Sequence, residues 1–205
     1  MSPVFATNGV VRLAHWGLMR ARGADAANFL HGQLTSDMLK LGAERAVLAG
    51  YCSAKGRLQA SFVVWRSAAD ELLLACVADV LAPTLKRLAM FVLRAQCKLS
   101  DASAELPLYG LAGDAAASRL GDAPVWSRRD TPEGTLIRLP DAAGVQRAML
   151  AAAQAPDGLP EISLDTWRWL EVSSGLPLIE AATVEQFVPQ MVNLELLGGV
   201  DFRKG

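Results

Sequence analysis

The sequence lacks both an excess of charge of one sign and any long apolar run. Its 20 lysines and arginines stand against 21 aspartates and glutamates, which gives a formal net charge of −1. A dedicated nucleic-acid-binding domain carries a basic surface, so direct nucleic-acid binding is not expected. There is no stretch of about 18 uninterrupted apolar residues, and the first residues lack the basic and apolar pattern of a secretory signal. We therefore expect a cytoplasmic protein that makes no membrane contact.

Histidine and cysteine are scarce. The chain has two histidines, His15 and His31, and three widely spaced cysteines, Cys52, Cys76 and Cys97. Because no two cysteines form a CxxC pair and histidines are few, a zinc or iron centre is disfavoured. The cysteines are predicted to be small buried hydrophobic residues in a reducing compartment. We expect no metal site.

The signature loops of several enzyme classes are also missing. The sequence contains no GxGxxG, GxxxxGK[ST] or GxSxG motif. The first two motifs bind dinucleotides and nucleoside triphosphates through glycine-rich loops, and the third presents a nucleophilic serine. None of these activities is predicted, and the sequence identifies no catalytic residue.

A large apolar fraction is present: 52% of the residues are hydrophobic, enough for a sizeable core. Residues 1–102 are predicted to form an α+β module with a β-α-β-β-β-α-β order, close to ferredoxin-like modules. Asp25 is expected to cap its first helix, and Thr35 or Ser36 to cap a short second one. The predicted strands span residues 10–19, 46–52, 58–66, 71–77 and 96–100, and the longest helix runs from about 83 to 92.

Residues 103–205 are predicted to form a second α+β module that packs with the first as one body. Its alanine-rich stretches favour helices because alanine costs least in a helix. Beyond residue 172 the chain is rich in loops, which carry function more often than cores do. The predicted strands span 107–112 and 134–139, and the predicted helices span 114–120, 141–152 and 164–172, the last capped by Ser163 or Asp165.

The five tryptophans are the most informative aromatic residues. Trp167 and Trp169 are two positions apart on a predicted helix, so they point to different faces. A tryptophan in a cleft can stack on a flat ligand, at about 1–3 kcal/mol per base in nucleic-acid sites. The alternative is a packed side chain with a satisfied indole N–H. The residues alone favour packing.

Several segments resemble, in the same order along the chain, segments of the YgfZ family of folate-binding proteins, which is related to the glycine-cleavage T-protein. They are GADAANFLHGQLTSD at 23–37, CSAKGR at 52–57, GLP at 175–177, FVPQMVNL at 187–194 and GGVDFRKG at 198–205. The last segment enters the family signature K-G-C-[FY]-x-G-Q-E. Of that signature Lys204 and Gly205 are present, and the family's cysteine would follow Gly205.

The resemblance implies an aminomethyltransferase (T-protein)-like fold, with α+β modules around a central folate cleft and the C-terminal β-barrel domain missing from these residues. It implies a protein that binds tetrahydrofolate or a derivative and supports iron–sulfur protein assembly or repair and tRNA modification. Two tryptophans of the family's folate site fall on Trp16 and Trp167, whereas Trp169 keeps the packing role. Reduced folate and iron–sulfur proteins are the expected partners of a monomer.

Three amide side chains within the resembling segments are candidates for the same ligand. Gln33, Gln190 and Asn193 could hydrogen-bond the donors and acceptors of a pterin, and stabilisation of their own loops is the equal alternative. The resemblance leaves open whether the protein catalyses a one-carbon transfer.

One departure from the related aminomethyltransferases limits the expected activity. Where those enzymes carry a pair of aspartates after the hairpin glycine, this chain has Gln59, Ala60 and Ser61. A neutral amide and a methyl group cannot act as a general base or hold a developing cation, so glycine-cleavage activity is not expected. A folate-dependent aminomethyltransferase and a non-catalytic interaction module with the same fold are the alternative functions.

Overall fold

The computed structural model describes residues 7–204, and the chain divides into two compact units. Unit 1 consists of residues 1–14 and 105–176, and unit 2 consists of residues 15–104 and 177–205. Each unit is therefore assembled from two separate stretches of the chain. The two units are described one at a time below.

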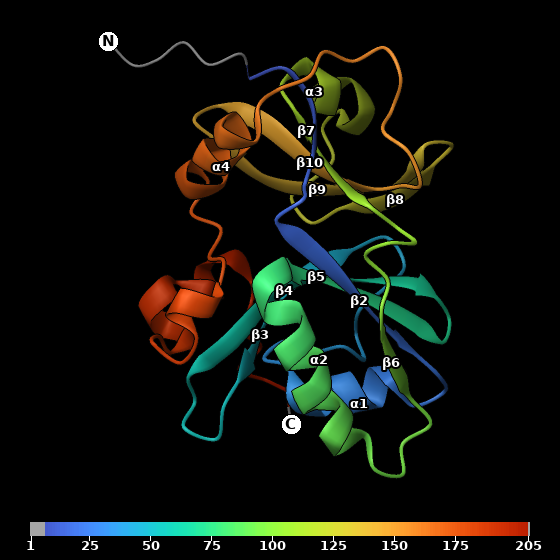
Figure 1. Ribbon diagram of the computed structural model, residues 1–205, viewed down its shortest axis with the longest axis vertical. Helices are drawn as coiled ribbons and strands as arrows, with labels where there is room; N and C mark the ends of the chain where they lie inside the picture. Colours follow the sequence, from blue (N-terminus) through green and yellow to red (C-terminus); the bar gives the residue numbers. More distant parts are fainter. Residues whose placement is uncertain (1–6, 205) are drawn as a thin grey trace. The chain divides into compact units, whose positions relative to one another are not determined.

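Unit 2 is built on a five-stranded antiparallel sheet with the strand order β3-β4-β5-β2-β6 (Figure 1). Helices α1 (Ala26–Gln33) and α2 (Ala78–Val92) join the strands in the order β2-α1-β3-β4-β5-α2-β6. This is the element order predicted from the sequence. The strands are β2 (Trp16–Arg22), β3 (Ala46–Cys52), β4 (Leu58–Ala68), β5 (Glu71–Val77) and β6 (Lys98–Asp101).

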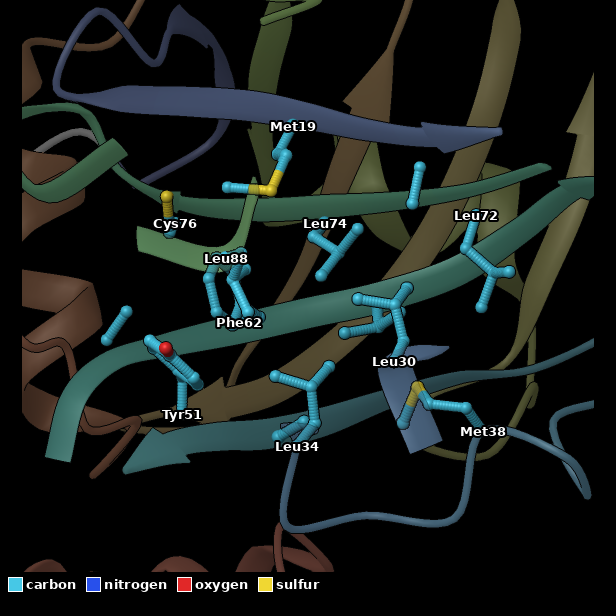
Figure 2. Packing of buried hydrophobic residues seen from close by; sticks show 14 of the residues in the cluster. Met19, Leu30, Leu34, Met38, Tyr51, Phe62, Leu72, Leu74, Cys76 and Leu88 are labelled. Atoms are coloured by element: carbon cyan, nitrogen blue, oxygen red, sulfur yellow. The ribbon is translucent and has the colours of Figure 1, made fainter. Parts of the chain in front are cut away.

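Both helices of unit 2 contribute to one apolar cluster on one face of this sheet (Figure 2). Alternate strand residues such as Phe62, Leu72 and Leu74 point into the cluster, because side chains in a strand alternate between the two faces. Leu30 of α1 and Leu88 of α2 are fully buried in the same cluster. Each such side chain contributes roughly 1.5–3 kcal/mol by its burial. The helices are thereby fixed against the same strands.

The C-terminal segment, defined here as residues 177–204, belongs to unit 2. It is mostly irregular, and its regular parts are short 3-10 helices. These are η1 (Ala181–Thr183), η2 (Pro189–Val192) and η3 (Leu194–Leu197). Its backbone groups find partners mainly in turns and in the strands of unit 2, as described below for the candidate site.

Unit 1 contains a second five-stranded antiparallel sheet, with the order β1-β7-β10-β9-β8 (Figure 1). Its helices are α3 (Asp114–Leu120) and α4 (Leu164–Ser173). The hydroxyl of Ser163 accepts a hydrogen bond from the Thr166 amide at 3.1 Å, which confirms the predicted cap of α4. The strands are β1 (Gly9–Arg12), β7 (Leu108–Ala112), β8 (Arg128–Thr131), β9 (Gly134–Ala142) and β10 (Val145–Ala151).

The two helices of unit 1 pack on opposite faces of its sheet. Leu120 of α3 joins an apolar cluster that contains Leu111 of β7. The neighbouring Gly110 points the other way, where a Cβ atom would lie 2.7 Å from ring carbons of Trp167 on α4. Only glycine leaves room for the indole at this position, since consecutive strand residues face opposite sides.

The predicted strand over residues 10–19 is wrong. The chain leaves the first sheet after Arg12 and enters the second at Trp16, so β1 pairs with β7 whereas β2 pairs with β5 and β6. Strand pairing with distant segments decides this, and a local alternation pattern cannot show it. For the same reason the units differ from the predicted ranges 1–102 and 103–205 in their assignment of the two chain ends.

The helix predicted over residues 141–152 is also wrong. These residues form the end of β9, a two-residue turn and β10. Ala143 and Gly144 both have positive φ, 49° and 78°, as in the tight turns that match the twist of a hairpin. The alanine content favoured a helix, but helix propensity is a weak preference that pairing with β7 and β9 overrides. The short strand β8 was not predicted.

Candidate functional site

Several of the segments that carry the family resemblance lie in unit 2, where the C-terminal segment runs along the start of β4. The Leu58 amide donates to the Phe187 carbonyl, and the Glu185 amide donates to the Leu58 carbonyl, both at 2.8 Å. Arg57 in the β3–β4 hairpin donates to the Gln186 carbonyl at 2.9 Å. These bonds join the hairpin segment 52–57 to residues far along the chain.

Thr35 connects the α1–β3 loop to the segment before the signature. Its hydroxyl donates to the Gly199 carbonyl at 2.5 Å and accepts from the Gly50 amide at 2.7 Å. The Asp201 amide in turn donates to the Thr35 carbonyl at 3.0 Å. The predicted helix cap at Thr35 or Ser36 is therefore wrong, because residues 35–40 form no helix and the Thr35 hydroxyl is used for this tertiary link.

Ser36 and Asp25 also depart from their expected capping roles. The buried Ser36 hydroxyl donates to the Leu48 carbonyl of β3 at 2.7 Å. Asp25 occupies the position before α1, but its carboxylate accepts from the Gln96 amide at 2.7 Å and caps no helix amide. Both side chains hold loops in place through partners that are distant in sequence.

The Asp37 carboxylate, in the same loop, contacts backbone N–H groups and two basic side chains. Its carboxylate accepts from the Leu39 and Lys40 amides at 2.9 and 3.1 Å, and its Oδ2 lies 3.0 Å from the Lys40 ammonium. The His31 Nδ1 atom lies 3.1 Å from Oδ1. The hydrogen bond from Lys40 is the main cause that lowers the pKa of Asp37 to about 2. Asp37 also lines a hollow of about 210 Å³ together with Asp201.

Of the signature residues, Lys204 lies against the end of α1, and Gly205 lies outside the described residues. The Lys204 ammonium donates to the Leu34 carbonyl. Burial lowers the pKa of Lys204, and the carboxylates of Asp37 and Asp201 oppose that change. The structure thus brings the segment at 198–204 onto the segment at 32–37, more than 160 residues earlier.

The three candidate amides lie on segments that converge here. Gln33 is the half-buried last residue of α1, whereas Gln190 in η2 and Asn193 after it are exposed. Asn193 adopts a left-handed conformation with φ of 53°. Within residues 7–204 none of these three amide groups takes part in a hydrogen bond, so their donors and acceptors are available. A role in ligand binding stays a prediction.

The two tryptophans expected at a folate site lie in different units. Trp16 begins β2 in unit 2, is 6% exposed and meets the His15 ring edge-on at 6.3 Å between centroids. Trp167 in unit 1 is fully buried, and its indole N–H donates to the Glu171 carboxylate at 2.7 Å. Trp167 therefore packs, and ligand contact by either residue stays a prediction. Trp169, expected to pack, is 42% exposed.

Arg147 is a functional candidate that the sequence did not reveal. It lies fully buried on β10, with its guanidinium carbon 5.2 Å from the centroid of the Trp167 ring. Its Nε donates to the Pro140 carbonyl at 3.1 Å, and its two terminal nitrogens have no hydrogen-bond partner among the described residues. Burial lowers the pKa of Arg147 to about 10, against the attraction of Glu171 and Asp141. The sequence feature that could have indicated this residue is an arginine within an otherwise largely apolar strand.

The start of β4 carries no carboxylate at the three positions compared with the aminomethyltransferases. Ala60 is buried in the apolar cluster, and the Ser61 hydroxyl accepts from the Ile179 amide at 3.1 Å. Gln59 donates through Nε2 to the Glu185 carboxylate at 3.2 Å. Gln59 and Ser61 thus bind the C-terminal segment, and none of the three side chains can serve as a general base.

The thiols and acidic residues form no metal site in the part of the chain that is described. All three cysteines are free, and burial raises the pKa of each thiol, to about 12 for Cys76. Cys76 is buried as expected, whereas Cys52 and Cys97 are half-buried. Among residues 7–204 no helix is both long and apolar enough to cross a bilayer.

Known proteins similar in sequence cover nearly all of this chain. It is 32% identical over 215 residues to the tRNA-modifying protein YgfZ of Edwardsiella ictaluri (strain 93-146), across 96% of this chain and 63% of that protein. It is 27% identical over 209 residues to the protein of the same name from Escherichia coli O139:H28, again across 96% of this chain. The chain spans just under two thirds of the length of these curated relatives. No protein-family model matches it.

A solved structure supports the fold independently of sequence. The glycine cleavage system aminomethyltransferase T from Bartonella henselae aligns with a TM-score of 0.61 and 17% identity, over 72% of this chain and 42% of that one. At that identity the similarity shows the fold alone, and it confirms the predicted α+β aminomethyltransferase-like fold. Along 96% of its length the chain is thus similar to proteins named tRNA-modifying protein YgfZ, and its fold is aminomethyltransferase-like.

Proposed function

We propose that this chain binds a reduced folate, tetrahydrofolate or a derivative, and acts as an accessory protein that supports iron–sulfur protein assembly or repair and tRNA modification. The relatives named tRNA-modifying protein YgfZ support the link to tRNA. The fold shared with an aminomethyltransferase supports a pocket suited to the same kind of ligand. The proposal also places the protein in the cytoplasm as a monomer, with iron–sulfur proteins as partners.

One observation carries the proposal. Two segments that resemble the family, at 32–37 and 198–204, are joined by hydrogen bonds within unit 2, and Arg57 of a third segment, 52–57, donates to the Gln186 carbonyl just before a fourth, 187–194. The side chains of Thr35, Arg57 and Lys204 donate to backbone carbonyls of distant loops. The side-chain amides of Gln33, Gln190 and Asn193 form no hydrogen bond among the described residues. Side-chain amides without a partner beside a hydrogen-bonded loop region support a ligand site there.

The available residues fit a pterin in chemical type. A pterin edge alternates donors and acceptors, and a carboxamide offers one acceptor and two donors to match it. Gln190 and Asn193 are exposed and can reorient, and Trp16 offers an aromatic ring with a small exposed area. A reduced folate, when bound, supplies a carrier for one-carbon groups. The residues of this chain would bind and orient it.

Aminomethyl transfer of the glycine-cleavage type is the less favoured function. At the compared positions of β4, Gln59 is neutral and Ala60 is buried in the core. A developing positive charge on the substrate would therefore meet no carboxylate from this strand. An accessory role that needs binding without this chemistry agrees better with the site.

Isothermal titration of the chain with 5-formyltetrahydrofolate tests the proposal. We expect saturable binding in the original chain and affinity about tenfold lower in a Gln190→Ala/Asn193→Ala double variant, since each lost hydrogen bond costs roughly 0.5–1.5 kcal/mol. Leu196→Ala, at an exposed residue of η3, is the matched control. Absence of heat and of saturation in the folded chain would refute folate binding, and equal affinity in the double variant would refute this placement.

A further inference from the structure

A groove runs along helix α2, which is drawn in green in Figure 1, and polar atoms without hydrogen-bond partners lie beside it. It has a volume of about 290 Å³ and lies entirely within unit 2. Its walls come from one face of α2 and from the C-terminal segment. We call it the α2 groove, and it is lined by Val80, Pro83, Arg87 and Met90 of α2 with Gln59 and Val184.

The position of the groove follows from the two faces of the helix. Leu81 and Leu88 face the apolar cluster of unit 2 and are buried. Pro83, Arg87 and Met90 follow one another at spacings of four and three, so they share another stripe of the helix. That stripe is left to border the groove.

Two polar atoms at the groove are buried without a partner among the described residues. They are Nε of Arg87, a donor, and Oε1 of Gln59, an acceptor. Gln59 donates through its other amide atom to Glu185, which leaves Oε1 as the free acceptor. Because a buried polar group without a partner destabilises the fold, a ligand that bonds to both atoms is favoured.

Positive charge and apolar surface continue beside the groove. Lys86 and Arg94 of this region, like Arg87, form no ion pair with any residue in the described range. The exposed fractions of Met90, Phe91 and Leu93 are 61%, 47% and 86%. Large apolar side chains gathered at one helix end, beside unpaired cations, indicate an interaction surface.

We infer that the α2 groove docks an acidic, apolar peptide segment of another protein. An apolar side chain of that segment packs between Pro83 and Met90, and a neighbouring carboxylate binds Arg87 and Lys86. A backbone N–H of the segment donates to Gln59 Oε1. The partner is thus recognised by both the apolar surface and the charge of the groove.

Charge argues against two other occupants. A second copy of this chain bound face to face would bring its own Lys86 and Arg87 close to the same two cations, because a two-fold interface pairs like surfaces. A nucleic acid would bind the cations through phosphates and would leave the apolar wall of Pro83 and Met90 unused. An acidic peptide with apolar side chains uses every group at the groove.

The test begins with a random peptide library displayed on phage and selected on the immobilised full chain. We expect enriched sequences that combine Asp or Glu with Leu, Phe or Trp. A fluorescein-labelled synthetic copy of one such peptide is then titrated against variants by fluorescence anisotropy. Met90→Asp and Arg87→Glu should each weaken its binding about tenfold or more, the loss expected for a central contact.

Matched changes make the result specific. Lys55→Glu alters the charge equally at an exposed turn of unit 2 outside the groove and should leave peptide affinity unchanged. A peptide with Lys in place of its acidic residues should regain affinity for Arg87→Glu. If Arg87→Glu does not fold by circular dichroism, the exposed Lys86→Glu serves instead.

Four results would overturn the inference. They are the absence of any enriched acidic, apolar sequence; equal peptide affinity in Met90→Asp, Arg87→Glu and the original chain; self-association of the chain that Met90→Asp abolishes; and tRNA binding that depends on Lys86 and Arg87 but not on Met90. The third would identify a second copy as the occupant, and the fourth a nucleic acid.

Discussion

Unit 1 and unit 2 each build a five-stranded antiparallel sheet, but they use polar side chains in different ways. In unit 2 the helices cover one sheet face with an apolar cluster, and polar residues such as Thr35 tie loops together at the edge. In unit 1 a charged residue, Arg147, lies fully buried against the ring of Trp167. The stability of unit 1 therefore depends on how this buried guanidinium packs and bonds inside the unit.

In each unit, one residue from the sequence analysis has a structural role that differs from the role expected of it. Trp167 was expected at a ligand, and its burial, its bond to Glu171 and its contact with Gly110 make it a structural centre of unit 1. Thr35 was expected to cap a helix, and it joins two segments of unit 2 that are 164 positions apart. Three changes test this contrast.

The largest effect is expected from Trp167→Ala. The change removes a fully buried indole together with its hydrogen bond to the Glu171 carboxylate, so the free energy of unfolding should fall by about 3–5 kcal/mol. Urea unfolding followed by circular dichroism measures the loss. Trp169→Ala, which removes the partly exposed neighbour on the same helix, should cost clearly less. Equal losses would contradict the central role of Trp167.

A smaller effect is expected from Thr35→Val, which keeps the side-chain shape and removes the hydroxyl. The Gly199 carbonyl and the Gly50 amide lose their partner, at a cost of about 1–3 kcal/mol. Hydrogen exchange should speed up in residues 198–202. Thr183→Val, whose hydroxyl bonds only within an exposed turn, is the control. Unchanged exchange in residues 198–202 would show that Thr35 does not hold this segment.

The smallest effect concerns Asp37 and pH. Its folded-state pKa is depressed, so its stabilising contribution is complete above the ordinary value of 3.8 and is lost as the pH falls toward about 2. The stability advantage of the original chain over Asp37→Asn should shrink across that window in urea unfolding. Lys40→Gln removes the main cause and should move the titration of Asp37, followed by NMR, back toward 3.8. A carboxyl that titrates near 3.8 in the original chain would contradict the structure.

Local patterns sufficed for most of unit 2 between residues 46 and 92. There the strands are mostly apolar runs, the turns between them carry glycine or short polar residues, and helix α2 has a regular apolar stripe. In unit 1 the alanine-rich strand β10 was taken for a helix, because its strand character comes from β7 and β9 on either side. Pairing partners, and not the segment itself, decided its structure.

The candidate site was predictable only in part. Motif order pointed to Gln33, Lys204 and the segments that carry them, and the structure brings those segments together. The link through Thr35 joins residues that no local rule connects, and the buried Arg147 gives only a weak signal in an apolar strand. Such contacts depend on which distant segments become neighbours after folding.

The pairing of β1 with β7 has a consequence for synthesis on the ribosome. Strand β1 leaves the ribosome early, but its partner at residues 108–112 follows about a hundred positions later. At roughly 5–20 residues per second, β1 waits on the order of 5–20 s with its backbone groups unpaired. During that interval the unpaired backbone N–H and C=O groups of β1 can bond to other chains. A chaperone that binds β1 should therefore raise the yield of folded protein.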